Sequence, residues 1–331
     1  MSNDVGASSR SARALDFDRP SFRSTPLPPE ASALCRDHPR LQELRARYRS
    51  FGQAVTSHVS WTDRYLLDEL DLRYFRGDNA YVWQLRGLRD HELAARSYAL
   101  TAYYVRSIDT LGLFERLEED GLFGVHTFEV GRRLVSRDLL DSVNEILFLE
   151  RHLGLSRLPE VRFVDIGAGY GRLAHRVTVG LPNVARFLCA DAVPESTFLC
   201  EFYLRFRGVS DRARAVPLDE IEAVLLAEGA DIATNIHSFS ECSADVIRWW
   251  IDLLHRARVP HLLIVPNDGE RLLSREADGT ARDFMPLLEQ AGYRLRVSEP
   301  KYLDPTVQKH GVHGGYYHLF DRASEASSPS T

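Results

Sequence analysis

The sequence predicts an α/β protein built on a mainly parallel sheet and preceded by a helical region. From about residue 160 onward, short apolar runs alternate with segments of helical periodicity. The first apolar run ends at Asp165, and glycines follow at every second position, Gly167, Gly169 and Gly171. The next apolar run ends at another acid, Asp191. Such alternation places helices on both faces of a parallel sheet, whose ligands bind at the carboxyl ends of the strands.

Composition is that of an ordinary globular protein, with 44% hydrophobic and 27% charged residues. The net charge of −6 argues against nucleic acid as the main partner. No window approaches the roughly 18 apolar residues of a membrane span, and the N-terminus lacks an apolar signal segment. The 4 cysteines have no metal-ligand spacing and no dense disulfide pattern, so we expect a reducing, cytoplasmic setting.

The part before the sheet divides into a leader and a helical region. Residues 1–37 begin rich in Ser, Arg and Pro and are expected to be a flexible leader, and residues 324–331 a flexible tail. Residues 38–155 are expected to be mostly helical, because apolar positions recur at helical spacing over 91–111 and 137–153. Ser136 is the expected N-cap of the second helix, and Gly154 ends it.

Residues 156–323 carry the predicted sheet, whose strands alternate with helices. The clearest helices are expected at Ala244–Arg256 and Asp283–Gln290. Strands are expected at Arg162–Ile166, Ala185–Asp191, Ala213–Pro217, Ile232–Asn235, His261–Val265, Arg294–Glu299 and Tyr316–Asp321.

The glycine turn and the acid after the second strand together indicate a nucleotide-like ligand. A glycine has no Cβ and tolerates positive φ, so this turn can approach a ligand closely. Asp191, about 20 residues after Gly171, is placed to accept both hydroxyls of a ribose; the alternative is a helix N-cap. A dinucleotide fold requires Gly-x-Gly-x-x-Gly, but Arg172 occupies the third glycine position. A nicotinamide dehydrogenase is therefore disfavoured.

The pattern Asp-x-Gly-x-Gly-x-Gly resembles motif I of the class I S-adenosylmethionine-dependent methyltransferases, and the resemblance covers about residues 160–322. It implies a Rossmann-like seven-stranded methyltransferase sheet, closed by an antiparallel pair of strands joined through residues 300–315. It also implies S-adenosyl-L-methionine as the cofactor. The cofactor contacts that it implies are Asp165, Gly167, Ala168, Gly169, Gly171, Asp191, Ala192, Leu218, Asn235 and Arg137.

Three further segments are similar to a bacterial group of sugar O-methyltransferases. These are Asp78-Asn-Ala-Tyr-Val-Trp-Gln84, the helix start from Ser136 to Ser142, and Ser238-Phe-Ser-Glu241. The similarity implies methyl transfer to a hydroxyl of a sugar or glycosylated small molecule, such as a natural product or polysaccharide precursor. The helical region then forms a lid that excludes water. A homo-oligomer is compatible with this interpretation.

A sugar hydroxyl is a poor nucleophile at neutral pH. Methyl transfer to it therefore requires a base or a metal that helps to remove its proton. We predict His237, Glu241 and Asp268 as the catalytic candidates, with His237 as the base. The alternatives are a loop-bonding role for His237, a favourable helix-start position for Glu241 and a plain turn at Asp268. Asp268, Glu241 and a histidine as ligands of a divalent metal stay an open alternative.

The predicted substrate contacts are Trp83, Asp138, His310 and His313. The competing interpretations are a core aromatic residue for Trp83, a solvated helix face for Asp138 and an ordinary hairpin loop for the two histidines. Two other functions stay open. One is methylation of a non-sugar metabolite or a protein, and the other is a non-catalytic methyltransferase-fold binding module.

Overall fold

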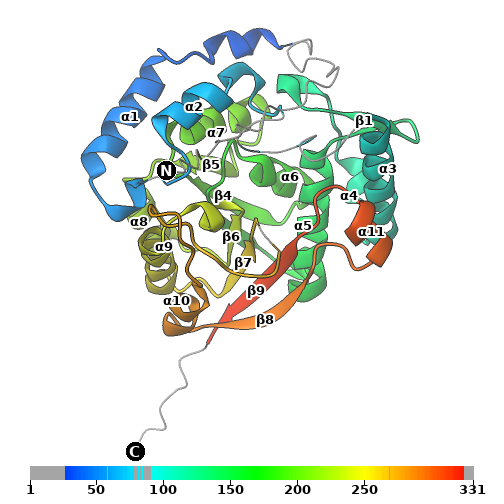
Figure 1. The fold of residues 1–331 in the computed structure, drawn as a ribbon. Coiled ribbons are helices and arrows are strands. Elements are labelled where there is room, and N and C mark those ends of the chain that lie inside the picture. Colours follow the sequence, from blue (N-terminus) through cyan, green and yellow to red (C-terminus); the bar gives the residue numbers. More distant parts are fainter. Residues whose placement is uncertain are drawn as a thin grey trace, which may run out of the picture.

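The computed structural model describes residues 27–57, 59–77, 81, 84, 91–267 and 269–323. A seven-stranded sheet runs through its centre in the order β5-β4-β3-β6-β7-β9-β8 (Figure 1). Its strands are β3 (Val161–Ile166), β4 (Val184–Ala190), β5 (Ala213–Val216), β6 (Ile232–Ile236), β7 (His261–Val265), β8 (Tyr293–Pro300) and β9 (Tyr316–Arg322).

The first five strands are parallel, and β9 is antiparallel to both of its neighbours, β7 and β8. The strand order reverses at β3, which pairs with β4 on one side and β6 on the other. Ligands of open parallel sheets bind outside the carboxyl ends of the strands at such a reversal. The predicted Rossmann-like seven-stranded sheet with an antiparallel closing pair is therefore confirmed.

Helices cover both faces of this sheet, as Figure 1 shows for α8, α9 and α10 on one side and α3, α4 and α5 on the other. Successive side chains of β3 enter different cores, because strand residues alternate between faces. Val164 and Ile166 pack with α8 and α9, while Phe163 packs with α5 and α6. The covering helices are α5 (Arg137–Leu153), α6 (Arg172–Gly180), α7 (Pro194–Phe206), α8 (Ile221–Glu228), α9 (Ala244–Arg256) and α10 (Met285–Gln290).

The N-terminal region is helical with one exception. It contains α1 (Pro39–Phe51), α2 (Asp63–Glu69), α3 (His91–Ile108) and α4 (Leu113–Arg116), but also an unpredicted hairpin of β1 (Phe128–Val130) and β2 (Arg133–Val135). Within the described residues, no helix is both long and apolar enough to cross a membrane.

The predicted leader differs from the structure in its last third. Pro29–Ala33 forms a short 3-10 helix, and Ala31 and Leu34 are buried in the same core as α8 and α9. These apolar side chains give residues 27–37 enough buried surface to pack, so this part is not a flexible leader. Residues 1–26 and the predicted tail from 324 lie outside the described residues.

The caps of α5 are those expected, because the Ser136 hydroxyl accepts a hydrogen bond from Leu139 N at 3.1 Å and Gly154 has φ +66°. The predicted loop over 300–315 contains a further helix, α11 (Pro305–His310). Asp304 caps it by accepting from the N–H groups of Thr306 and Val307. This helix packs against α3 and decides where the loop histidines lie.

Candidate active site

A cavity of about 120 Å³ opens at the carboxyl ends of β3, β4 and β6, beside the glycine turn. The turn and the strand-end acids form its floor, and residues of the N-terminal region, including Val55, Trp61 and Tyr81, form part of its wall. The predicted site residues that line it are Arg137, Asp165, Gly167, Ala168, Gly169, Asp191, Ala192, His237 and Glu241.

All three glycines of the turn are required by the backbone, because Gly167, Gly169 and Gly171 have φ of +72°, +56° and +84°. Space excludes a side chain as well. A Cβ at Gly167 would lie 2.3 Å from the Ser238 side chain. One at Gly171 would lie 2.9 Å from the sulfur of Cys200. Gly167 and Gly169 therefore present bare backbone to the cavity.

Asp191 is bound to this turn directly. One of its carboxylate oxygens accepts from Gly169 N at 2.9 Å and the other from Val193 N at 2.8 Å. Burial raises the pKa of Asp191 to about 7, despite these hydrogen bonds. The N-cap of α7 is Val193 and not Asp191, so the N-cap alternative for this acid is wrong. A carboxylate has about four lone-pair sites, so Asp191 has acceptor capacity left for the cavity.

Asp165 lies beneath the turn at the end of β3, where its Oδ1 accepts from the Thr234 hydroxyl at 2.6 Å. Burial raises the pKa of Asp165 to about 7 as well. Four acids therefore line the cavity, namely Asp165, Asp191, Glu241 and Asp141. Such a wall suits a cationic ligand once the carboxyl groups are ionised.

Three predicted cofactor contacts do not line the cavity, namely Gly171, which faces Cys200 and Leu204, together with Asn235 and Leu218. Asn235 is fully buried and joins two segments, because its Nδ2 donates to Ile166 O at 2.9 Å and its Oδ1 accepts from Phe239 N at 2.9 Å. Leu218 is also buried, and its N–H donates to the Tyr48 hydroxyl at 3.0 Å. Neither residue lines the cavity. Asn235 thus joins Ile166 to Phe239, and Leu218 is bonded to Tyr48 of α1.

His237 follows β6 in a backbone conformation that is uncommon for a side-chain-bearing residue, with φ +68°. Its N–H donates to Val265 O at 2.7 Å, which anchors the residue at the strand end. Its Nδ1 is buried and has no hydrogen-bond partner among the described residues. Burial, and then the charge of Arg137, lower the pKa of His237 to about 3. The ring is therefore neutral at physiological pH.

Beside His237 lies a buried charged group that joins α5 to the end of β8. Arg137 Nε donates to Asp141 Oδ2 at 3.0 Å, and Lys301 Nζ donates to Asp141 Oδ1. Burial alone would raise the pKa of Asp141, but Lys301 and Arg137 hold it well below its usual range. Next to them, Arg172 pairs with Glu145 at 2.9 Å. Three cations thus face two carboxylates, which leaves one surplus positive charge at this end of the site.

Lys301 is a residue that the sequence reasoning misses. It is one of only two lysines in the chain, the other being Lys309. It directly follows β8, whose carboxyl end opens on the site. Those two facts are the signal that points to it.

Glu241 lies in the cavity wall, where Trp61 Nε1 donates to its Oε2 at 2.6 Å and Asn267 Nδ2 to its Oε1 at 3.2 Å. Burial raises the pKa of Glu241. Trp61 belongs to the N-terminal region, so this carboxylate joins that region to the segment after β6. Trp61 is a further site residue that the sequence reasoning does not identify, because its partner lies 180 positions away.

Tyr81, which also belongs to the N-terminal region, lines the cavity as well. Its hydroxyl lies 3.0 Å from the Ser196 hydroxyl, at the start of α7. Its ring lies 5.3 Å from the Trp61 ring and 5.7 Å from that of Tyr170. Trp61 and Tyr81 therefore form an aromatic wall directly above Gly169, where an added Cβ would lie 3.1 Å from the Tyr81 ring.

The predicted substrate contacts are largely not brought to the cavity. Asp138 is 1% exposed and engaged on both oxygens by Arg76, Arg176 and Tyr170, so direct contact with a substrate is wrong for it. His310 is exposed at the end of α11, because that helix turns it away from the sheet. His313 contributes its carbonyl oxygen, which accepts from Lys301 Nζ at 3.1 Å.

Trp83 and Asp268 lie outside the described residues. Among the residues that the structure does describe, no three His, Cys, Asp or Glu side chains are grouped so as to hold a metal ion.

No family model and no curated protein matches the chain. The solved structures that it resembles include magnesium protoporphyrin IX methyltransferase (ChlM) from Synechocystis PCC 6803 with bound SAM, at 13% identity over 67% of this chain and 97% of that one, with a TM-score of 0.40. The mitomycin 7-O-methyltransferase MmcR is 22% identical over 56% of this chain and 57% of its own, with a TM-score of 0.36. A protein in the NADB-Rossmann superfamily from Streptococcus agalactiae is 14% identical over 59% and 71%, with a TM-score of 0.40. The function is therefore argued from the residues of the cavity.

Proposed function

We propose that this protein is an S-adenosylmethionine-dependent O-methyltransferase that methylates a hydroxyl of a sugar or glycosylated small molecule. One observation carries the proposal. At the strand-order reversal, a single cavity combines a bare glycine turn, a strand-end acid and a neutral, buried histidine with an unpartnered nitrogen.

The donor set of the cavity suits this cofactor. The residual acceptor capacity of Asp191 suits two ribose hydroxyls, and the backbone of Gly167 and Gly169 allows close approach. The acids of the wall suit its sulfonium and ammonium charges, and the surplus cation beside Arg137 suits its carboxylate.

S-adenosylmethionine, held by the glycine turn and Asp191, would supply a methyl group on a sulfonium centre, and in-line transfer of that methyl group to the acceptor oxygen would release S-adenosylhomocysteine. His237 accepts the hydroxyl proton at its free Nδ1 as the new ether bond forms. Arg137 is one cause of the low pKa of His237. An anion paired with Arg137 offsets that cation, so the pKa of His237 rises when a carboxylate binds there.

Two arguments support a sugar as the acceptor: the similarity to the group of sugar O-methyltransferases, and the side chains that form the cavity wall. Trp61 and Tyr81 offer aromatic faces, and His237 and Ser57 add polar groups in the same cavity. Carbohydrates suit such surfaces, because their C–H faces pack on aromatic rings while their hydroxyls hydrogen-bond. Residues 38–155 act as a lid that keeps water from the reaction.

Calorimetry with S-adenosylhomocysteine and with NAD tests the cofactor. We expect binding of the former only, and binding of NAD alone would overturn the proposal. Methyl transfer from labelled S-adenosylmethionine to panels of glycosides, aglycones and peptides then tests the acceptor. Tight cofactor binding without transfer to any of them would favour a non-catalytic binding module.

A further inference from the structure

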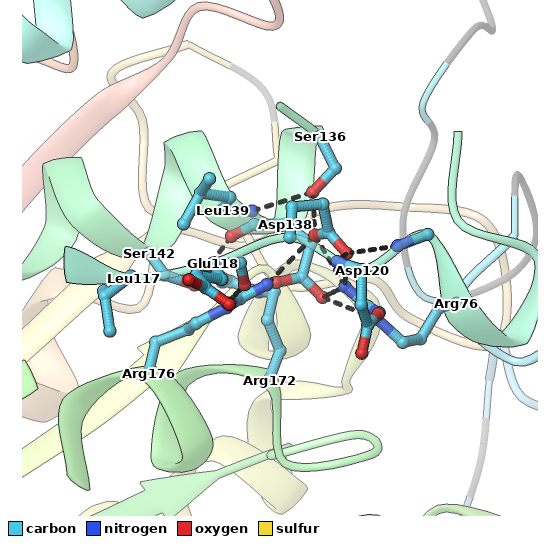
Figure 2. Close-up of polar contacts among 12 residues, drawn as sticks. Arg76, Leu117, Glu118, Asp120, Ser136, Asp138, Leu139, Ser142, Arg172 and Arg176 are labelled. Carbon is cyan, nitrogen blue, oxygen red and sulfur yellow. Dashed lines mark hydrogen bonds and ion pairs between the residues drawn. The ribbon is translucent and has the colours of Figure 1, made fainter. Parts of the chain in front are cut away.

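A buried ionic network links the N-terminal region to the glycine turn. At its centre is Asp138 on α5, on which Arg76 and Arg176 converge from opposite sides, as Figure 2 shows. Arg76 Nε donates to Asp138 Oδ2 at 3.1 Å and Arg176 Nε to Oδ1 at 3.2 Å. The third donor is the hydroxyl of Tyr170, at 2.7 Å from Oδ2. Tyr170 is the residue between Gly169 and Gly171.

Glu119 is the second buried carboxylate of the network. It accepts from Arg76 Nη2 at 2.8 Å, from Arg176 Nη2 at 3.0 Å and from the Ser136 hydroxyl at 2.6 Å. These two arginines and two carboxylates all have side chains at most 2% exposed. Arg76 Nη1 also pairs at 3.2 Å with Asp120, which is 34% exposed and pairs in turn with Arg207. Buried ions that keep full sets of partners hold a fixed geometry, because moving one leaves another uncompensated.

Tyr170 connects this ionic network to the glycine turn. Its ring is held among Phe75 at 5.1 Å, Tyr81 at 5.7 Å and Tyr203 at 5.4 Å. Its hydroxyl bonds to Asp138, which the two arginines keep ionised by lowering the pKa of its carboxyl group. The preceding residue, Gly169, donates its N–H to Asp191. This N–H belongs to the peptide one residue before Tyr170, so a shift of Tyr170 reaches it through Gly169 alone.

We infer that Asp138, acting through Tyr170, is a positioning residue that fixes the glycine turn and Asp191 in the geometry that binds the cofactor. The inference rests on the proposed function. It also explains why Arg76, from the N-terminal region, is buried in this network. The same contact holds that region and the turn together.

The test compares two matched variants. Tyr170→Phe removes only the hydroxyl that bonds to Asp138. Tyr203→Phe removes a hydroxyl from the same buried aromatic group, but that hydroxyl lies 3.3 Å from His175 and does not touch the turn. For Tyr170→Phe we expect the Kd of S-adenosylhomocysteine and the KM of the cofactor to rise about tenfold, with kcat changed less than twofold. For Tyr203→Phe we expect a comparable fall in Tm and an unchanged Kd.

Amide hydrogen exchange of the peptide spanning residues 166–172 gives a second readout. We expect faster exchange in Tyr170→Phe and in Asp138→Asn than in Tyr203→Phe. If Asp138→Asn does not fold, the tyrosine pair decides. An unchanged Kd and unchanged exchange in Tyr170→Phe would overturn the positioning role alone. Failure of the wild-type protein to bind S-adenosylhomocysteine would overturn the proposed function, and this inference with it.

Discussion

The backbone N–H of Gly169 donates to the Asp191 carboxylate at 2.9 Å, so the turn after β3 and the acid after β4 form one unit. Each needs the other. The Asp191 carboxylate holds the turn in place by accepting this hydrogen bond. The bond uses one lone pair of Oδ2, and the other lone pair of that oxygen can accept a hydrogen bond from a ligand in the cavity. Changes at either residue therefore affect the same ligand.

Replacing Asp191 by Asn tests the predicted ribose contact. Asparagine keeps an acceptor for Gly169 N–H but loses the charge, and hydrogen bonds to charged groups contribute about 1.5–3 kcal/mol. We expect the Kd of S-adenosylhomocysteine to rise about 10- to 100-fold in calorimetry. The control is Asp231→Asn, because Asp231 pairs with Arg162 at 2.8 Å and precedes β6 at the opposite sheet edge. An unaltered Kd in Asp191→Asn would remove this acid from the site.

Stability should depend on pH through the same acid. The ordinary pKa of Asp is about 4, and burial raises that of Asp191 to about 7. Between these pH values the folded state holds a proton that the unfolded state has lost. The contribution of this group to the free energy of unfolding is full below pH 4 and is lost as the pH rises through 7. His237 acts in the opposite sense at lower pH, because its folded pKa is lowered to about 3.

The informative quantity is accordingly the difference in Tm between Asp191→Asn and the wild type. We expect this difference to shift in favour of the variant as pH rises from 5 to 8, in the absence of cofactor. Thermal unfolding across this range measures it. A constant difference would show that Asp191 has an ordinary pKa. Asp165→Asn is a second case, because burial also raises the pKa of Asp165 to about 7.

His237→Gln separates catalysis from binding. Glutamine has similar polarity and volume but cannot accept the hydroxyl proton, and positioned bases contribute about 10²- to 10⁴-fold. We expect kcat to fall by at least about 100-fold while the Kd of S-adenosylhomocysteine changes less than twofold. Single-turnover methyl transfer and calorimetry measure the two quantities. Normal turnover in the variant would dismiss His237 as the base.

Trp61→Phe tests whether the N-terminal region is held over the cavity. The change keeps an aromatic ring but removes the N–H that donates to Glu241 at 2.6 Å. We expect cofactor dissociation to accelerate severalfold, because the lid loses one of its hydrogen bonds. Trp249→Phe asks whether the effect is local to the cavity wall, since Trp249 Nε1 on α9 donates to Gln53 Oε1 at 2.6 Å, another contact of the N-terminal region that lies outside that wall. Equal dissociation rates in the wild type and both variants, measured by stopped flow, would contradict the lid.

Much of the sheet follows from local signals in the sequence. Each of the seven strands lies within two residues of its predicted limits, because apolar runs end where a glycine, an acid or a proline interrupts them. The helix α9 matches its predicted range, Ala244–Arg256. The glycine turn can also be predicted from local sequence, because glycine adopts positive φ readily and occupies all three positions of the turn that have it.

Side-chain roles depend on partners that are distant in sequence. Asp138 has the sequence features of a ligand contact, but Arg76, 62 residues away, turns it into the centre of a buried network. Asn235 stands at a strand end that favours function, yet its amide joins Ile166 to Phe239. Lys301 meets Asp141 across 160 residues, which no spacing rule reveals.

The ion pairs between α5 and α6 determine where this chain can be divided. Arg172 and Arg176 lie on α6, the first helix after the glycine turn, and their carboxylate partners are Glu145 and Asp138 on α5 and Glu119 before that helix. All of these partners precede residue 156. A fragment that starts there would keep every strand of the sheet but would leave two guanidinium groups without counter-ions beside an uncovered apolar face. The change from helical to alternating sequence near residue 156 thus marks no independent folding unit, and a minimal cofactor-binding fragment must retain α5 and Glu119.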